Sequence, residues 1–194
     1  PYGISKLQAE FIHQEWQKED PKNRKLLILR PAVIFGLSEN GNFSRLYRSI
    51  SKKYFFYPGR KDTKKACIYV KDLVQVSISM NRQLNNNIHT YNMCYPIPYS
   101  IENICNTISK VTKNKKPIVS IPSFLLKFSS YILFYSSKVL GFKINGIHPE
   151  RISKLMISTN ILGRKLAKHN FILKFTLEDA IIDWNKDCNS EGLF

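Results

Sequence analysis

The sequence predicts an α/β fold, because helix-like and strand-like segments alternate along the chain. The clearest strand is a near-continuous apolar run over 26–35, which is typical of a parallel strand buried between two covering layers. A helix is predicted before it, over 2–19, and Asp20-Pro21 should end that helix. Capping residues and apolar periodicity predict further helices over 43–52, from Asp72 to about Gln83, from Ser100, and over 180–184.

Apolar spacing within these elements indicates which side chains should reach a core. In the first helix we expect core contacts from Leu7, Phe11 and Trp16. In the second, one stripe contains Phe43, Leu46, Tyr47 and Ile50. Short strands are predicted over 54–57 and 89–94. Asp72 and Ser100 are the expected N-caps of the helices that they open, and the segment from Thr176 repeats the capping pattern.

Composition favours a packed intracellular globule without a metal site. The 194 residues are 43% hydrophobic, which argues against disorder. The four cysteines are scattered without C-x-x-C spacing, so reduced thiols in a cytosolic protein are expected. The four histidines show no H-x-x-x-H spacing, so no metal is expected.

The charge is strongly basic, with 30 Lys and Arg against 14 Asp and Glu. Such a balance attracts polyanions, among them a nucleotide diphosphate or an anionic membrane surface. The excess is spread evenly along the chain, and no basic arm or RNA-binding signature is present. We therefore expect no nucleic-acid partner.

The most informative pair stands at the start of the chain. Tyr2 and Lys6 are four residues apart, so on a helix they share one face. An ammonium at that distance favours the phenolate form of the tyrosine, which can then exchange a proton with a sugar or alcohol hydroxyl. The lysine has spare donors for a ribose hydroxyl.

Three segments in order extend this pair to a family resemblance that covers essentially the whole chain. They are Tyr2-Gly3-x-Ser5-Lys6-x-x-Ala9-Glu10, the strand 26–36 with its Leu29-Arg30-Pro31, and Ile68-Tyr69-Val70-Lys71-Asp72-Leu73. Together they resemble the extended short-chain dehydrogenase/reductases, the NAD-dependent epimerase/dehydratase family. Segments 41–43, 53–59 and 65–70 are most similar to the bacterial O-antigen sugar 4-epimerases, a group that includes enzymes acting on N-acetylglucosamine carried by undecaprenyl diphosphate.

The resemblance implies an enzyme that uses NAD to epimerise C4 of a sugar through a 4-keto intermediate. It implies Tyr2 as the acid/base and Lys6 as the residue that holds the nicotinamide ribose. Pro31, Ala32 and Val33 would meet the nicotinamide end of NAD. The substrate, a sugar on a nucleotide or lipid diphosphate, would meet Asn42 and Lys65. Two alternatives stay open: Asn42 only fixes its loop as an Asx turn, and Lys65 is a solvated loop lysine. Val33 stands where UDP-galactose epimerases carry an asparagine that contacts the diphosphate, so that contact is not expected here.

The resemblance also predicts how the chain is organised. The family's G-x-x-G-x-x-G loop, which cradles the cofactor pyrophosphate, does not occur in this sequence. We therefore expect the C-terminal part of an NAD-binding Rossmann-like fold plus a small, mainly helical substrate-binding domain. The Rossmann-like portion is placed at 1–95, interleaved with substrate-binding segments at about 37–66. The rest of the substrate-binding region is placed at 96–188, followed by a tail at 189–194.

The segment 118–142 leaves two interpretations open, an interfacial helix on the membrane and an amphipathic helix packed in the substrate domain. Its lysines make the uncharged runs too short to span a bilayer. The expected location is cytoplasmic, with peripheral contact at the inner membrane face under the first interpretation. The complete enzyme is expected to be a homodimer that uses the tyrosine helix.

Two further functions remain open. One is a nucleotide-sugar 4,6-dehydratase or a reductase of the same family. The other is a catalytically inactive fragment that only binds, because without the upstream strands the apolar faces of 26–35 would be exposed and would favour association.

Overall fold

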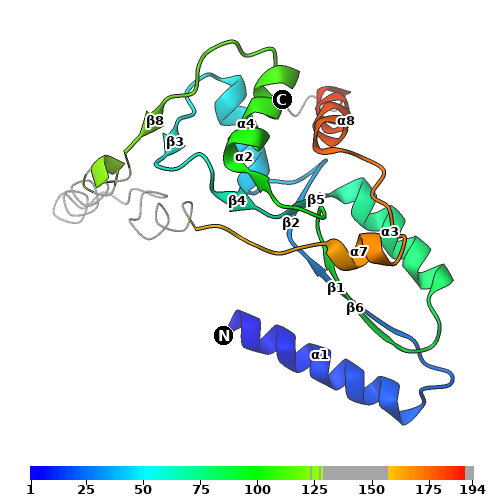
Figure 1. Cartoon of the computed structure of the whole chain (residues 1–194). Helices are drawn as coiled ribbons and strands as arrows, with labels where there is room; N and C mark the ends of the chain where they lie inside the picture. The colour runs from blue at the N-terminus through cyan, green and yellow to red at the C-terminus, as the bar shows by residue number, and fades with distance from the viewer. Residues whose placement is uncertain (123, 127, 129–156, 191–194) are drawn as a thin grey trace. The chain divides into compact units, whose positions relative to one another are not determined.

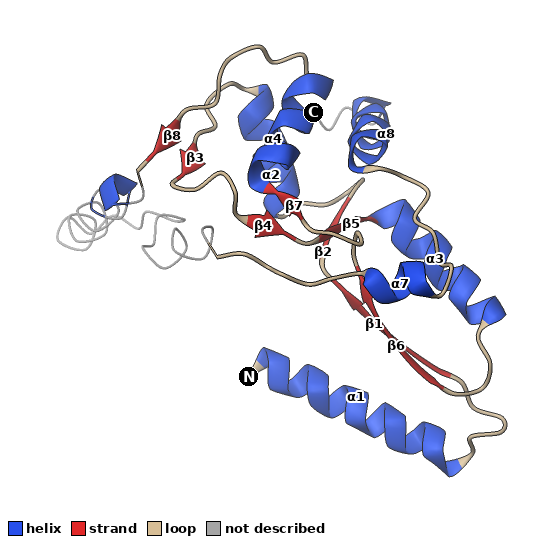
Figure 2. Cartoon of the chain, viewed as in Figure 1, coloured by secondary structure: helices blue, strands red, loops and turns tan. Residues whose placement is uncertain are grey.

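The computed structural model describes residues 1–122, 124–126, 128 and 157–190, and within them helices and strands alternate as an α/β fold (Figure 1, Figure 2). The helices are α1 Tyr2–Glu19, α2 Asn42–Ser51, α3 Val70–Gln83, α4 Ile101–Val111, α7 Arg164–Lys168 and α8 Leu177–Ser190. The strands are β1 Leu26–Pro31, β2 Val33–Phe35, β3 Tyr57–Pro58, β4 Lys64–Lys65, β5 Cys67–Tyr69, β6 Ile88–Met93, β7 Tyr99–Ser100 and β8 Ser120–Ile121.

The chain forms two compact units. Unit 1 consists of residues 1–36, 66–97 and 161–176, and unit 2 consists of residues 37–65, 98–160 and 177–194. Unit 1 contains two parallel strand pairs, β1 with β6 and β2 with β5. Unit 2 contains the parallel pair β3 with β8 and the antiparallel pair β4 with β7.

The predicted strand 26–35 is two strands, which divide at Ala32. Up to Pro31 the chain pairs with β6, where Leu26 faces Ile88 and Pro31 faces Met93. From Val33 it pairs with β5 instead, beginning opposite Cys67. The Ala32 N–H still donates to the Met93 carbonyl at 3.1 Å, so the change of partner comes directly after the last bond to β6. The expected burial was also wrong in part: of these residues only Ile28 and Phe35 are buried, while Val33 and Ile34 are 36% and 37% exposed.

The core of unit 1 lies where α3 and α7 pack near β5 and β6. Its buried residues are Ile68, Val76, Met80, Tyr91, Met93, Leu166 and Phe171. Tyr91 bonds through its hydroxyl to Nδ1 of His169 at 2.8 Å, and the two rings meet edge to face. These contacts join the C-terminal segment of the unit to β6.

Asp72 lies in the first turn of α3 and is not the N-cap that the sequence suggested. The helix begins at Val70 with Tyr69 as the capping position. The fully buried Asp72 carboxylate instead accepts backbone N–H bonds from Lys174 at 2.7 Å and Phe175 at 3.3 Å. Because burial disfavours the charged form, the pKa of this carboxyl lies above its ordinary value, although the two amide bonds oppose the shift.

The core of unit 2 is built from apolar stripes of three helices. The stripe of α2 buries Phe43, Tyr47 and Ile50 as predicted, while Leu46 is half-buried. α4 buries Ile104, Cys105 and Ile108, and α8 buries Ala180, Ile181, Trp184 and Cys188. Trp184 meets the ring of Tyr47 edge-on at 5.2 Å. Ser100 caps α4 as predicted: its Oγ accepts from the Asn103 N–H at 3.0 Å, and the Asn103 side chain accepts from the Ser100 N–H.

The other predictions have mixed outcomes. The strand expected over 54–57 is confined to Tyr57–Pro58, and the strand expected over 89–94 runs from Ile88 to Met93. All four cysteines are free and buried. Most of the segment 118–142, on which the membrane interpretation depended, lies outside the described residues. Among the described helices none is long and apolar enough to cross a membrane.

Candidate functional site

Helix α1 carries the predicted acid/base pair on one exposed face. Tyr2 and Lys6 lie one turn apart, and the Lys6 Nζ is 5.6 Å from the centroid of the Tyr2 ring. Tyr2 is 77% exposed, so its hydroxyl is accessible to a ligand. The structure therefore brings together the two side chains that the sequence singled out, in the order and on the face that helical spacing requires.

A third residue of this face, Glu10, links α1 to the end of β1. It follows Lys6 by four residues, each such step turning only about 40° around the helix axis. Its carboxylate accepts two bonds from Arg30, from Nε at 2.8 Å and from Nη2 at 2.5 Å. This bidentate hydrogen bond lowers the pKa of the Glu10 carboxyl. Arg30 directly precedes Pro31, so the ion pair connects the tyrosine face with the residues predicted to meet the cofactor.

Sequence reasoning missed the Glu10–Arg30 pair, although both residues stand inside the matched segments. The signal was available, because Glu10 continues the four-residue spacing of Tyr2 and Lys6 and Arg30 ends the apolar run of β1. What the spacing could not supply was the register of α1 against the strand.

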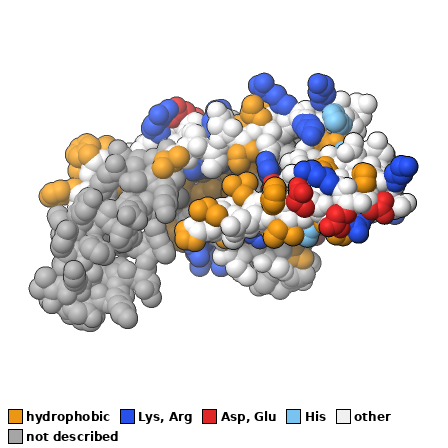
Figure 3. Space-filling model, turned by 90° about the horizontal axis from the view of Figure 1, so that it is seen from below, with side chains coloured by type: hydrophobic (Ala, Val, Ile, Leu, Met, Phe, Trp, Pro, Cys, Tyr) orange, Lys and Arg blue, Asp and Glu red, His pale blue; other side chains and the backbone are white. Residues whose placement is uncertain are grey.

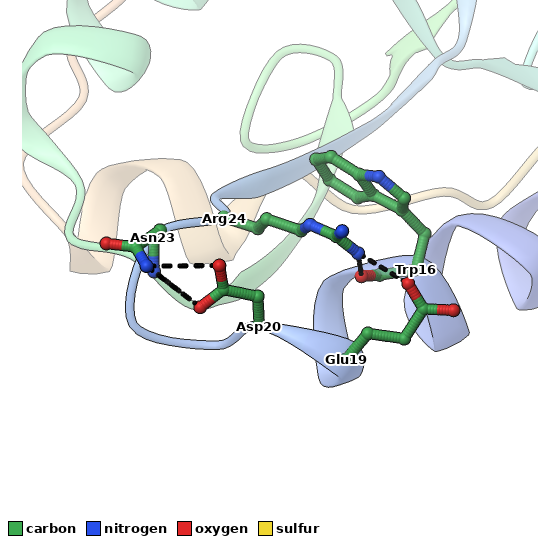
Figure 4. Close-up of polar contacts among 5 residues, drawn as sticks. All are labelled: Trp16, Glu19, Asp20, Asn23 and Arg24. Atoms are coloured by element: carbon green, nitrogen blue, oxygen red, sulfur yellow. Dashed lines mark hydrogen bonds and ion pairs between the residues drawn. The ribbon is translucent and has the colours of Figure 1, made fainter.

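Helix α1 is also held at its C-terminal turn (Figure 4). Arg24 donates to the Trp16 carbonyl at 2.5 Å and to the Glu19 carboxylate at 2.6 Å, with its guanidinium 4.9 Å from the Trp16 ring. The Asn23 side-chain amide donates to both oxygens of Asp20. The helix ends at Glu19, as Asp20-Pro21 predicted, and the turn that follows is stabilised by its own polar residues.

The apolar side chains of α1 do not enter a core, contrary to the sequence prediction. Leu7 and Phe11 are each 62% exposed and Trp16 is 43% exposed. The only buried residue of the helix is Gln17, whose side-chain amide donates to the Arg24 carbonyl. Figure 3 shows hydrophobic side chains at the surface along this helix. Within the described residues, Leu7 and Phe11 therefore remain mostly exposed to solvent.

The predicted cofactor residues lie between the two strand pairs of unit 1. Pro31 ends β1, Ala32 donates its N–H to the Met93 carbonyl at 3.1 Å, and Val33 donates to the Ala66 carbonyl at 3.3 Å. Ala32 is half-buried, while Pro31 and Val33 are exposed. Such positions outside the carboxyl end of a parallel strand are where α/β sheets bind ligands.

The two predicted substrate residues lie in unit 2. Asn42 is the first residue of α2 and is exposed, and its side chain makes no hydrogen bond within the described part of the chain. The Asx turn that it could have formed is absent there. Near the start of α2, the Glu39 carboxylate instead accepts the Ser44 N–H at 2.7 Å.

Lys65 lies in β4 and is half-buried. Its Nζ donates to the Ile157 carbonyl at 2.8 Å, which uses one of its three donors and leaves two for an anion. Burial lowers the pKa of this ammonium below its ordinary value, because a charged group loses hydration there.

A shallow depression of about 650 Å³ runs along α3, where it is lined by Val70, Val74, Ile78 and five polar residues of the same helix. It contains none of the predicted site residues. Among the described residues no group of three or more His, Cys, Asp or Glu is arranged to hold a metal ion.

Comparisons with known proteins give a consistent picture. No family model matches the chain. It is 26% identical over 180 residues to N-acetyl-α-D-glucosaminyl-diphospho-ditrans,octacis-undecaprenol 4-epimerase of Escherichia coli O157:H7, covering 93% of this chain and 54% of that protein.

The fold matches solved epimerase structures. The UDP-N-acetylglucosamine 4-epimerase of Bacillus cereus superposes with a TM-score of 0.65 at 18% identity, covering 95% of this chain and 53% of the other. The UDP-glucuronic acid 4-epimerase of the same organism, solved in complex with NAD, gives a TM-score of 0.61 at 14% identity over 96% and 52%. The chain therefore spans about half the length of the proteins that it matches.

Proposed function

The chain belongs to the extended short-chain dehydrogenase/reductase family, and from that premise we propose that the enzyme containing it is an NAD-dependent sugar 4-epimerase. The observation that carries the proposal is the exposed Tyr2–Lys6 pair on one face of α1, tied through Glu10 and Arg30 to the end of β1. The two units would then correspond to the C-terminal part of a Rossmann-like domain and to a mainly helical substrate-binding domain.

The residues of unit 1 fit the nicotinamide end of NAD. The Lys6 ammonium has donors available for ribose hydroxyls, and the backbone from Pro31 to Val33 offers a surface without charge for an aromatic ring. The pyrophosphate would need a cradle from outside this sequence, which contains no glycine-rich loop. When bound, NAD supplies the redox step at C4 of the sugar, and the protein supplies positioning and proton transfer.

Tyr2 is the residue proposed to move the proton. As a phenolate, its oxygen would accept the proton of the sugar hydroxyl at C4, and the tyrosine hydroxyl so formed would later return a proton to the C4 oxygen. The Lys6 ammonium lies beside it, 5.6 Å from the centroid of the Tyr2 ring. Inversion at C4 requires that the sugar present its other face in between, so Tyr2 must act from a fixed position. The Glu10–Arg30 pair is suited to hold the helix in that position.

The substrate is proposed to be a sugar on a diphosphate, carried by a nucleotide or by a polyprenol, in the synthesis of a polysaccharide such as an O-antigen. The name of the Escherichia coli relative supports the polyprenol carrier and those of the Bacillus cereus proteins support a nucleotide. Lys65 would pair with the diphosphate as a point charge and Asn42 would hydrogen-bond the substrate. The exposed apolar residues of α1 support a homodimer through this helix, and the location would be cytoplasmic, with peripheral contact at the inner membrane face.

A test of this function is product analysis by NMR with the enzyme that contains this chain. We expect UDP-N-acetylglucosamine or its polyprenyl counterpart to give the C4 epimer, and Tyr2→Phe to lower kcat by at least about a hundredfold without loss of fold. A product that has lost water would identify a dehydratase instead, and net consumption of reduced cofactor would identify a reductase. Full activity of Tyr2→Phe would remove Tyr2 from the mechanism.

A binding measurement separates the enzyme from the inactive-fragment alternative. NADH added to the 194-residue chain is followed by nicotinamide fluorescence. Saturable binding that Lys6→Ala weakens would support a nicotinamide site within this chain. Absence of binding by the chain, together with activity of the longer enzyme, would show that the cofactor needs the upstream residues.

A further inference from the structure

Two helices of unit 2, α2 and α4, end in the same way. In each, the N–H of the second residue after the C-cap bonds back across the last turn, from Tyr54 to the Ser49 carbonyl at 3.1 Å and from Asn114 to the Ser109 carbonyl at 2.9 Å. This is the Schellman arrangement, in which the residue just after the C-cap adopts a left-handed conformation that favours glycine. Here both positions are lysine, with φ of 62° at Lys53 and 54° at Lys113.

The loops that follow these helices, residues 52–56 and 112–119, lie side by side and form one surface. The Asn114 side chain donates to the Ile50 carbonyl at 2.8 Å, and the Lys116 Nζ donates to the Lys53 carbonyl at 3.0 Å. The Tyr57 N–H then donates to the Val119 carbonyl at 2.9 Å, where β3 and β8 begin to pair (Figure 1). We call residues 52–56 and 112–119 the lysine loops.

The lysine loops concentrate positive charge. Their five lysines are Lys52, Lys53, Lys113, Lys115 and Lys116, all exposed. None of these ammonium groups forms an ion pair within the described part of the chain. The sequence has no Asp or Glu from residue 40 to residue 61 or from residue 103 to residue 149. Both loops therefore lie in stretches of sequence that carry lysines and no carboxylate.

Exposed apolar side chains accompany the lysines. Inside the loops, Tyr54 is 62% exposed and Val119 is 64% exposed; farther along the chain, Phe124 and Leu125 are 68% and 48% exposed. Lysines beside aromatic and aliphatic side chains are the composition of surfaces that rest on an anionic bilayer, with cations at the headgroups and apolar groups among the acyl chains. Single-stranded nucleic acid would use the aromatic faces for stacking, but it gains little from Val119 and Leu125.

We propose that the lysine loops are a docking surface for an anionic phospholipid bilayer. The biological role of this surface rests on the proposed function, since a membrane site would bring the enzyme to a sugar carried by a polyprenyl diphosphate. Its physical basis is separate, because the lysines and the apolar residues would act on any anionic bilayer. Attraction of this kind falls with ionic strength, so binding should weaken as salt is added.

The test is co-sedimentation of the 194-residue chain with vesicles of phosphatidylglycerol mixed with phosphatidylcholine, and with phosphatidylcholine alone. No sugar lipid is included. We expect binding only to the anionic vesicles, and Lys52→Glu with Lys115→Glu should weaken it by at least about tenfold, because each lysine near such a surface adds about a fivefold factor. Neither side chain makes a hydrogen bond in the described structure, so the fold should be retained, which circular dichroism checks.

Matched controls separate the surface from net charge. Lys22→Glu with Lys168→Glu makes the same change of charge at exposed lysines of unit 1, and should leave binding within about twofold. Val119→Ser should weaken binding, whereas Ile172→Ser, at a 78% exposed position of unit 1, should not. Equal losses in the two charge variants would overturn the proposal in favour of a general charge effect.

The remaining outcomes also decide the question. Absence of vesicle binding would overturn the proposed membrane surface. If the chain instead bound a labelled RNA oligonucleotide through Lys52 and Lys115, the lysine loops would be a nucleic-acid surface and the proposal would also be wrong. Epimerase activity on a nucleotide sugar is measured separately. Activity without vesicle binding would leave the proposed function standing and remove the membrane surface. Vesicle binding without activity would leave the membrane surface standing and remove the proposed function.

Discussion

Helix α1 and the three helices of unit 2 show opposite relations between apolar residues and burial. In unit 2, α2, α4 and α8 bury their stripes against one another, and Trp184 and Ile108 have no exposed surface. Helix α1 also contains several large apolar residues, but Ile4, Leu7 and Phe11 are each more than 60% exposed. Unit 2 therefore has a core of its own, whereas the apolar side chains of α1 remain largely exposed within the described residues.

The difference teaches where the proposed chemistry depends on other parts of the protein. Asn42 and Lys65, which are proposed to bind the substrate, belong to unit 2, whose helices pack against one another. Tyr2 and Lys6 belong to a helix whose described anchors are polar, namely Glu10–Arg30 and the turn at Arg24. The positions of Tyr2 and Lys6 should thus depend more on contacts made by the exposed face of α1 than the positions of Asn42 and Lys65 do.

The largest expected effect contrasts one buried aromatic residue with one exposed one. Trp184→Ala should lower the free energy of unfolding by about 3–5 kcal/mol, because it leaves a cavity against Tyr47. Phe11→Ala should change it by less than about 0.5 kcal/mol, because Phe11 is mostly in water. Urea unfolding of the 194-residue chain measures both. A comparable loss for Phe11→Ala would mean that α1 is packed in solution and that the contrast is wrong.

The next effect concerns Asp72, which ties α3 to residues 174–175 in unit 1. Asp72→Ala should cost about 1–3 kcal/mol, because two buried amide donors lose their acceptor. Asp72→Asn keeps one acceptor oxygen and should cost less.

The pH dependence of Asp72 has a definite sign. Burial raises the pKa of its carboxyl in the folded state, so the folded protein holds this proton to higher pH than the unfolded chain does. The contribution of Asp72 to stability therefore falls as pH rises above about 4 and through the raised pKa. Asp72→Asn removes this fall, so its deficit against the parent protein should shrink with rising pH. A deficit that grows instead would show that the amide bonds outweigh burial.

A smaller effect on stability is expected at the Glu10–Arg30 pair, because Arg30 is half exposed and water screens the charges. Glu10→Gln should lower the free energy of unfolding by less than about 1 kcal/mol. Its effect on α1 should be larger, with faster amide hydrogen exchange in residues 3–12 than in the parent chain. Glu15→Gln is the control, since Glu15 pairs only with Lys18 on the same helix. Unchanged exchange in Glu10→Gln would remove this pair as an anchor of the tyrosine helix.

The sequence predicted elements best where local chemistry decides them. The helix over 2–19, the stripe of α2 and the Ser100 cap follow from spacing and capping within a few residues, and all three are present. The Tyr2–Lys6 face belongs to the same class, since it depends only on helical geometry.

Predictions failed where a distant partner decides the outcome. The predicted strand 26–35 divides at Ala32, because its first half pairs with β6 and its second half with β5. The Asp72 carboxylate accepts the N–H groups of Lys174 and Phe175 and does not cap its own helix. Leu7 and Phe11 have the spacing of core residues, but spacing does not state whether a partner is present in the same chain. The Glu10–Arg30 contact was missed for a related reason, because it depends on the register of helix against strand.

The smallest expected effect tests the helix ends of unit 2, which carry the lysine loops. Lys53 and Lys113 adopt a left-handed conformation that costs a residue with a Cβ about 1–2 kcal/mol, partly offset by the ~0.5–1 kcal/mol that glycine loses in entropy on folding. Lys53→Gly should therefore be more stable than Lys53→Ala by about 0.5 kcal/mol. Both variants lose the same charge, so their difference isolates the backbone, and urea midpoints measure it. Both should bind anionic vesicles equally less well than the parent chain, because the ammonium and not the backbone provides that attraction. If Lys53→Ala were as stable as Lys53→Gly, the left-handed conformation would be absent in solution, and the ordered pair of helix ends that presents the lysines would be absent with it.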